Sequence, residues 1–466
     1  MMSKPEKLTG QEKYDQLREE YPFMEYIGYE TNIDSSGFHV KYEFNLAGKY
    51  TFCPGFSIPK KKFFLSFPTY ESVQSPLFQN LIFHIGLIEL ISYWKSACPP
   101  KVIVKGQHLS KVQVSWWKNV YYQGLGEFFY TNEIQTSLEE FMHISSSGET
   151  IQPQAISLDE TAIVPIGGGK DSVVTLELLN KSEQIRPFIM NPRGATLECM
   201  RVAGFGKDSL IEVNRRLDPL LLELNAQGFL NGHTPFSALL AYYSLLVSAI
   251  SGHRNIALSN ESSANEPTVA GTDVNHQYSK SFAFESDFRD YVKQNISADF
   301  NYFSFLRPLN ELRIAQLFAE QVKYYPVFKS CNVGSKTDIW CCNCPKCLFA
   351  FTILSPFIPM IELVHIFGKN LFELPQMLGY LKELTGIDEV KPFECVGTIV
   401  EVNAALQMYI ARHKHEKLPL LIDYYSNTTN FSQGGVPKLA DKILTEFNND
   451  HFLEPRFLEI IKQKLK

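Results

Sequence analysis

Three glycines followed by lysine, aspartate and serine occupy residues 167–172, and these residue types suit the binding of a phosphate group. Residues 161–166, just before them, are apolar and rich in β-branched side chains, which predicts a strand. After the loop, apolar residues recur at a spacing that predicts a buried helix, at Val173, Val174, Leu176, Leu178 and Leu179. The loop is therefore expected at a helix N-terminus, where unpaired N–H groups and the helix dipole attract phosphate. The alternative is a tight glycine turn that binds no ligand.

Counting residues excludes two common glycine loops. A Walker A loop needs glycine five residues before Gly169 and a hydroxyl residue after Lys170, but Val164 and Asp171 stand at those positions. The dinucleotide fingerprint of the Rossmann fold would need its third glycine at Ser172. Neither class therefore accounts for the loop.

The loop instead resembles the PP-loop of ATP pyrophosphatases, whose pattern is Ser-Gly-Gly-x-Asp-Ser. Gly168, Gly169, Asp171 and Ser172 match this pattern, whereas Gly167 replaces the first serine. The hydroxyl contact of that serine is therefore lost or supplied elsewhere.

The PP-loop resemblance implies ATP as cofactor, with Mg²⁺. Gly167, Gly168, Gly169 and Ser172 would then bind pyrophosphate. Lys170 is a candidate charge partner, and Asp171 either holds Mg²⁺ or stabilises the loop; both are candidate catalytic residues.

Five of the nine cysteines fall between residues 331 and 347. Three of them have the spacing C-x2-C-x2-C, and a fourth precedes these by ten residues. Thiolates at such spacing can converge on one tetrahedral ion, and in a reducing compartment metal ligation is favoured over disulfides. The pattern predicts a structural Zn²⁺ site formed by Cys331, Cys341, Cys344 and Cys347. An iron–sulfur cluster or unliganded cysteines are the alternatives, and Cys342 is a spare thiol.

Several blocks resemble the family of ATP-dependent UDP-N-acetylmuramoyl-L-alanyl-L-glutamate epimerases of bacterial peptidoglycan synthesis. They lie at residues 167–172, 231–235, 259–261, 275–285, 331–347 and 391–398. The resemblance implies a UDP-muramoyl dipeptide substrate whose terminal L-glutamate is inverted to D-glutamate. It also implies an acyl-adenylate intermediate, with ATP converted to AMP and diphosphate.

These blocks contain further candidate site residues. Substrate or nucleotide contacts are expected at Asn260, Glu261, Tyr278, Lys280 and Glu285, with a polar helix cap or a solvated face as the alternative for each. His233, in a Gly-His-Thr loop, is either a catalytic residue or a capping or core histidine. Cys395 is either a thiol that transfers protons, as in cofactor-independent racemases, or a buried cysteine.

The elements that would position these residues change in type along the chain. Residues 1–155 are expected to form an N-terminal α+β domain, with strands at 38–44, 102–104 and 112–116 and a helix at 83–95. Residues 156–350 alternate strands at 161–166, 185–190 and 255–258 with helices near 217–224 and 238–251. That alternation predicts an α/β fold with a parallel PP-loop ATP-binding core whose ligands bind at the carboxyl ends of the strands. Residues 351–466 are expected to be mainly helical.

Composition excludes some classes of function. The net charge is −6 and the densest basic cluster is residues 60–62, so a nucleic-acid partner is not expected. The polar N-terminus lacks an apolar signal core, which favours the cytoplasm. The apolar stretch 347–368 contains two prolines, a glutamate and a histidine, so it predicts two buried helices and no membrane span. The sequence does not indicate an oligomeric state.

Two other functions fit the same motifs. A PP-loop followed by four cysteines also resembles 7-cyano-7-deazaguanine synthase in layout, so an adenylating ligase or an amidating, base-modifying enzyme is an alternative. A nucleotide sensor without catalysis is another.

Overall fold

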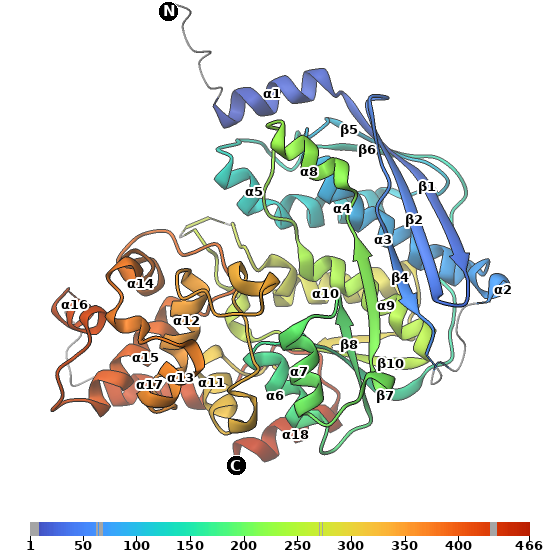
Figure 1. Ribbon diagram of the computed structural model, residues 1–466. Coiled ribbons are helices and arrows are strands. Elements are labelled where there is room, and N and C mark those ends of the chain that lie inside the picture. Colours follow the sequence, from blue (N-terminus) through green and yellow to red (C-terminus); the bar gives the residue numbers. More distant parts are fainter. Residues whose placement is uncertain (1–8, 62–63, 65–68, 270, 273, 429–435) are drawn as a thin grey trace, which may run out of the picture.

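A sheet of eleven strands connects the N-terminal and central parts of the protein (Figure 1). The computed structural model describes residues 9–61, 64, 69–269, 271–272, 274–428 and 436–466, so residue 62 of the basic cluster lies outside the described residues. The strands are β1 (Phe23–Ile33), β2 (Gly37–Leu46), β3 (Tyr50–Phe52), β4 (Gly55–Pro59), β5 (Lys101–Val104), β6 (His143–Ser146), β7 (Asp159–Pro165), β8 (Ile185–Met190), β9 (Ile211–Arg216), β10 (His253–Leu258) and β11 (Asn301–Ser304). Their order is β11-β10-β7-β8-β9-β4-β2-β1-β5-β6, and β3 pairs with β2.

In the N-terminal part, one face of the antiparallel region of the sheet is covered. In β2, Phe38, Val40, Tyr42 and Phe44 are buried while Lys41 between them is exposed, as the predicted strand at 38–44 requires. The buried face packs on α3 (Pro76–Trp94), which confirms the predicted helix at 83–95. The remaining helices of this part are α1 (Gly10–Glu20), α2 (Tyr70–Val73), α4 (Lys111–Gly124) and α5 (Gly126–Thr131).

The predicted strand at residues 112–116 is wrong, because these residues lie in α4. The Ser110 side chain accepts a hydrogen bond from the Gln113 backbone at 3.3 Å, and Gln113 accepts one from the Ser110 backbone at 2.9 Å. Such a capping box starts a helix. Trp116, Trp117 and Val120 are then buried at helical spacing. Apolar and polar residues alternate over only five positions, which was too short a pattern to distinguish a strand from this amphipathic helix.

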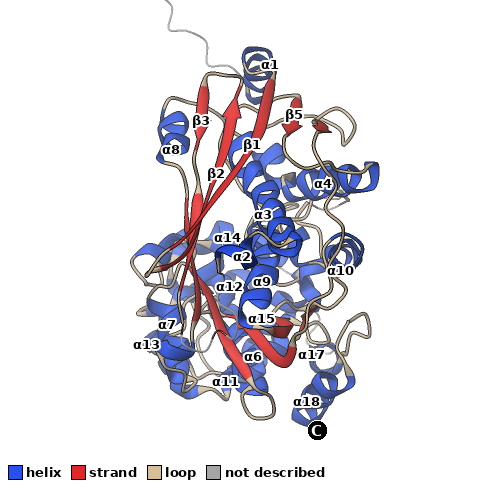
Figure 2. Ribbon diagram, turned by 90° about the vertical axis from the view of Figure 1, so that its right-hand side faces the viewer, coloured by secondary structure: helices blue, strands red, loops and turns tan. Residues whose placement is uncertain are grey.

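The central part alternates strands and helices. The helices are α6 (Lys170–Leu179), α7 (Gly194–Val202), α8 (Pro219–Ala226), α9 (Phe236–Ser251), α10 (Phe282–Asn295) and α11 (Glu311–Ala319). Strands β9, β8, β7, β10 and β11 pair in parallel. Figure 2 shows the twisted sheet with α3 and α9 on one side and α7 on the other. The expected mixed α/β fold with a large, mostly parallel sheet is confirmed.

The C-terminal part is helical, as expected. It contains α12 (Pro345–Leu354), α13 (Met360–Phe367), α14 (Leu378–Thr385), α15 (Ile399–Arg412), α16 (Leu420–Thr428), α17 (Val436–Thr445) and α18 (Pro455–Leu465). Helices α12 and α13 are the two helices predicted for residues 347–368. Among the described residues one helix, α3, is long and apolar enough to cross a membrane, and 94% of that apolar window is buried inside the protein.

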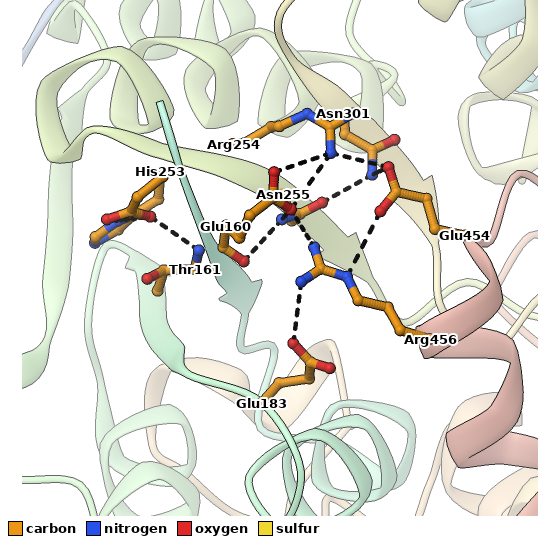
Figure 3. A network of polar contacts seen from close by, with 10 residues as sticks. Glu160, Thr161, Glu183, His253, Arg254, Asn255, Asn301, Glu454 and Arg456 are labelled. Carbon is orange, nitrogen blue, oxygen red and sulfur yellow. Dashed lines mark hydrogen bonds and ion pairs between the residues drawn. The ribbon is translucent and has the colours of Figure 1, made fainter. Parts of the chain in front are cut away.

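The last helix returns to the sheet through a polar network (Figure 3). Glu454, just before α18, accepts hydrogen bonds from Arg254 at 2.9 Å and from Asn301 at 3.2 Å. Arg456 contacts Glu160 at 2.5 Å and Glu183 at 3.5 Å. These partners lie at or near the starts of strands, so the opposite ends of β7, β8 and β10 stay free for a site.

Candidate active site

A cavity of about 490 Å³ opens at the carboxyl ends of β7, β8 and β10. Its lining includes Ile166 after β7, Met190 at the end of β8 and Asn260 after β10. The glycine loop, His233, Lys280 and Cys395 also line it. This is the edge of a parallel sheet where ligands are expected.

The glycine loop connects β7 with the start of α6. Gly168 has a φ of +81°, and a side chain there would meet the Ala195 backbone at 3.1 Å. Its carbonyl accepts a hydrogen bond from the Lys329 backbone at 2.8 Å. A side chain at Gly167 would meet nothing within 4 Å. The loop is therefore closely packed at Gly168 and open at Gly167, in front of the first N–H groups of α6.

Three carboxylates and one ammonium group lie at the base of the loop. The oxygens of Asp171, Glu261 and Glu311 lie within 4.8 Å of one another, and Lys170 forms ion pairs with Asp171 and Glu311. Burial opposes the charge of Lys170, but these two carboxylates raise its pKa. Burial raises the pKa of Glu311, with Lys170 opposing and Asp171 and Glu261 adding to the shift. An all-oxygen set of this kind suits a hard divalent cation.

Cys395 lies on the cavity wall among positively charged groups. Burial opposes its ionisation, but Lys280, a hydrogen bond with His276 and the charge of Lys346 lower the pKa of its thiol well below the ordinary value. Burial also opposes protonation of His276, yet its hydrogen bonds with Cys395 and Glu127 raise its pKa to about 9. These shifts favour the thiolate form of Cys395 and the imidazolium form of His276.

A second histidine adjoins this pair. The rings of His233 and His276 lie 4.4 Å apart between centroids. Nδ1 of His276 lies 2.5 Å from Oε2 of Glu127, and Nδ1 of His233 lies 3.3 Å from the same oxygen. Burial and the positive charge of His276 lower the pKa of His233 to about 4. The two rings thus differ in charge at neutral pH.

Hydrogen bonds hold the segment of Cys395 in place. Gln277 donates to the Val396 carbonyl at 2.9 Å. The Glu401 carboxylate accepts from the Thr398 backbone at 2.7 Å and from the Glu311 backbone at 2.6 Å. One buried carboxylate therefore ties the Cys395 segment to the helix that begins with Glu311.

The four cysteines of the predicted metal site converge. Their sulfurs all lie within 4.8 Å of one another, with 3.8 Å between Cys331 and Cys344 and 3.8 Å between Cys341 and Cys347. Zn–S bonds of about 2.3 Å in a tetrahedron would place two sulfurs about 3.8 Å apart. The thiol of Cys342 points elsewhere and donates to the Phe367 carbonyl at 3.0 Å. The donor set thus fits tetrahedral Zn²⁺ without Cys342.

The residues that were expected to contact substrate or nucleotide fall into two groups. Asn260 and Lys280 line the cavity, and Glu261 lies in the carboxylate cluster. Glu285 is buried and pairs with Arg307 at 2.9 Å, and the Tyr278 hydroxyl accepts from Asn119 at 3.1 Å. Tyr278 and Glu285 do not line the cavity, so we leave both out of the site.

Sequence reasoning did not single out several charged groups of the site: Glu127, His276, Glu311 and Lys346. His276 lies inside the block at residues 275–285, and its position next to the glutamine and tyrosine of that block was the available signal. Lys346 lies inside the cysteine block at residues 331–347, whereas Glu127 and Glu311 lie in segments without a recognisable motif. Glu127, from α5, is the contribution of the N-terminal part.

Comparisons with known proteins match most of the chain. Residues 16–305 match the family model described as the MurL N-terminal domain, and residues 327–436 match the MurL C-terminal domain. A protein from Xanthomonas oryzae pv. oryzae named UDP-N-acetyl-alpha-D-muramoyl-L-alanyl-L-glutamate epimerase is 37% identical over 340 residues, covering 70% of this chain and 74% of that protein. A protein of the same name from Salinispora tropica is 37% identical over 332 residues, covering 70% and 72%.

Proposed function

Because the chain belongs to the family of UDP-N-acetyl-alpha-D-muramoyl-L-alanyl-L-glutamate epimerases, we propose that it inverts the terminal L-glutamate of that muramoyl dipeptide in an ATP-dependent reaction. The observation that carries the proposal is the shared cavity. A glycine loop at a helix start and a thiol surrounded by cations line the same space of about 490 Å³. The first can bind pyrophosphate, and the second can move a proton.

The difficulty of the reaction explains why ATP would be needed. Removing the α-proton beside a free carboxylate places two negative charges close together. At an effective dielectric constant of about 20, charges about 4 Å apart repel by about 4 kcal/mol, or on the order of a thousandfold in rate. Joining the carboxylate to AMP removes one charge and makes the carbonyl a better electron sink.

In the first step, the α-carboxylate of glutamate attacks the α-phosphate of ATP. A C–O–P bond forms, the bond between the α- and β-phosphates breaks, and pyrophosphate leaves. The N–H groups at the start of α6, with Gly167, Gly168, Gly169 and Ser172, would bind the leaving pyrophosphate. Lys170 would balance the charge of the carboxylates beside it.

In the second step, the thiolate of Cys395 removes the α-proton and a proton returns to the opposite face. The cations around Cys395 lower the pKa of its thiol, which favours the ionised form that can accept a proton. His276 and His233 are the neighbouring groups that can carry protons to and from it. Water then cleaves the adenylate, which gives AMP and the D-glutamyl product.

Two metal ions fit the donor sets of the site. Asp171, with Glu261 and Glu311, would hold Mg²⁺, which when bound shields the charge of the triphosphate. Cys331, Cys341, Cys344 and Cys347 would hold Zn²⁺, whose contribution is structural because four thiolates leave no open position. We further propose that the protein acts in the cytoplasm, on the UDP-linked dipeptide, without a nucleic-acid or membrane partner.

The test uses the full chain with ATP, Mg²⁺ and UDP-muramoyl-L-Ala-L-Glu in deuterium oxide. We expect AMP, diphosphate and deuterium at the glutamate α-carbon, with AMP release dependent on the dipeptide. AMP formation without α-deuterium, together with a stable amide after adding ammonia, would instead establish the ligase alternative. Unchanged ATP after long incubation with any plausible acid would favour the sensor.

A further inference from the structure

The short helix α5 of the N-terminal part touches each segment that carries a proton-transfer group. Asn132, at its end, donates to the Asn231 carbonyl at 3.1 Å, two residues before His233. Gly126, at its start, lies against Val274, two residues before His276. The Tyr130 ring lies 5.2 Å from the Phe393 ring, two residues before Cys395. This helix is therefore the common support of three segments that are far apart in the sequence.

One carboxylate oxygen of α5 holds both histidine rings. Oε2 of Glu127 lies 2.5 Å from His276 and 3.3 Å from His233. Glu127, His233 and His276 are also residue types that could together bind a metal ion. In a tetrahedral site with bonds of about 2.0–2.1 Å, however, two ligand atoms lie about 3.3 Å apart. The 2.5 Å separation is too short for two ligands of one metal, and the two atoms instead share a short hydrogen bond between the ring and the carboxylate.

We infer that Glu127 is a positioning residue of the proton-transfer site, which keeps His276 charged and oriented toward Cys395 and keeps His233 beside it. This inference rests on the proposed function for its role in the reaction. The arrangement follows the logic of a thiol, a histidine and a carboxylate, in which the carboxylate sets the orientation of the ring and the ring stabilises the thiolate. The N-terminal part thereby takes part in the chemistry.

Other charged groups also face these residues. Lys280 and Lys346 favour the Cys395 thiolate, and Glu394 lies beside it. Lys95, directly after α3, donates to the Gly232 carbonyl and faces Glu127. Among the described residues, none of these four charged groups contacts the Nδ1 atom of His233 or of His276. Removing Glu127 alone therefore changes the charge of His276 while the lysines stay.

The test measures how fast iodoacetamide labels Cys395 as a function of pH, by peptide mass spectrometry, in the wild type and in Glu127→Gln. Glutamine keeps the size of the side chain but loses its charge. We expect the midpoint of the labelling profile to rise by about one pH unit, so that the labelling rate at pH values below the midpoint falls about tenfold. Glu139→Gln, which removes an exposed carboxylate of the same part of the chain, should keep the wild-type profile.

Buried cysteines report whether the variant is folded. Cys98 and Cys199 are buried, so they stay unlabelled unless the chain unfolds. If they react in Glu127→Gln, Glu127→Asp decides, because it keeps the charge but withdraws the carboxylate from both rings, and it must also raise the midpoint. An unchanged Cys395 profile in a folded variant overturns the inference. Labelling needs neither ATP nor dipeptide, so this result is independent of α-deuterium incorporation, which tests the proposed function.

Discussion

At the residue scale, the charged side chains of the cavity lie in two regions. Three carboxylates lie beside Lys170 at the base of the glycine loop, where their oxygens suit a cation. Lys280, Lys346 and His276 lie around Cys395, where they suit an anionic substrate, and the two lysines also act on Asp171. One region would serve adenylation and the other proton transfer, so substitutions should be able to affect one step and leave the other.

Replacing Cys395 by serine should separate adenylation from proton transfer. A serine hydroxyl is similar in size but does not ionise near neutral pH, so it cannot act as the base. We expect α-deuterium incorporation to fall at least about a hundredfold, while exchange of labelled pyrophosphate into ATP continues. Cys53→Ser, outside the cavity lining, is the matched control and should keep both activities. Deuterium incorporation near the wild-type rate in Cys395→Ser would exclude the thiol as the base.

The glycine loop allows a matched pair of substitutions. Gly168→Ala should lower the free energy of unfolding by at least about 1–2 kcal/mol, because its φ of +81° disfavours a side chain and Ala195 lies 3.1 Å away. Gly167→Ala should change it by less than about 0.5 kcal/mol, because the space there is open. Urea unfolding measures both. Equal effects at the two positions would contradict this account of the loop.

The sequence predicted part of the candidate site. The glycine loop and the four cysteines could be found because their residue types and spacing carry the chemistry within one segment. Glu127 and Glu311 could not, because each is a single acidic residue in an ordinary helix. Their importance comes from the fold, which brings α5 to His276 and the start of α11 to Lys170.

At the scale of elements, the cysteine segment connects the glycine loop with the helices of the C-terminal part. Lys329 donates to the Gly168 carbonyl, and Ser330 lies against Gly169. Cys344 is the residue before α12, and Lys346 in its first turn faces Cys395. Metal binding by the cysteines would therefore stabilise both sides of the cavity.

Loss of zinc should consequently weaken the whole site. Cys344→Ser should abolish binding of one zinc per chain, lower the melting temperature and reduce α-deuterium incorporation, because the segment that supports the glycine loop loses its crosslink. Cys342→Ser should retain zinc, because its thiol points to the Phe367 carbonyl. Metal analysis by inductively coupled plasma mass spectrometry distinguishes the two. Equal zinc content in both variants would argue against the proposed ligand set.

Elements with a strong residue pattern were also the predictable part of the fold. Strands β7, β8 and β10 are short runs of β-branched and other apolar residues, and they were expected close to where they lie. Helix α4 was missed because its first residues alternate apolar and polar, and the capping box at Ser110 decides the outcome. Helix α5 has six residues, too few for a periodic pattern to be recognised.

At the scale of the whole molecule, the sheet does not stop at the segment near residue 155 where the sequence changes character. Antiparallel pairing of β4 with β9 joins the two parts. A buried ion pair crosses the same junction: Glu89 in α3 accepts from Arg215 in β9 at 2.6 Å, and Tyr243 in α9 donates to Glu89 at 2.9 Å. Pairing between distant strands has no signal in local composition, so this continuity could not be predicted from the sequence.

The continuous sheet should make the N-terminal and central parts unfold together. We expect one urea transition, with tryptophan fluorescence and circular dichroism coinciding. Glu89→Gln should lower the free energy of unfolding by about 3 kcal/mol, because it leaves the mostly buried guanidinium of Arg215 without a counterion. Glu89→Leu combined with Arg215→Met should recover most of that loss, since neither charge is then left unpaired. Two separate transitions in the wild type, or a double variant as unstable as the sum of its single variants, would mean that the junction does not couple the two parts.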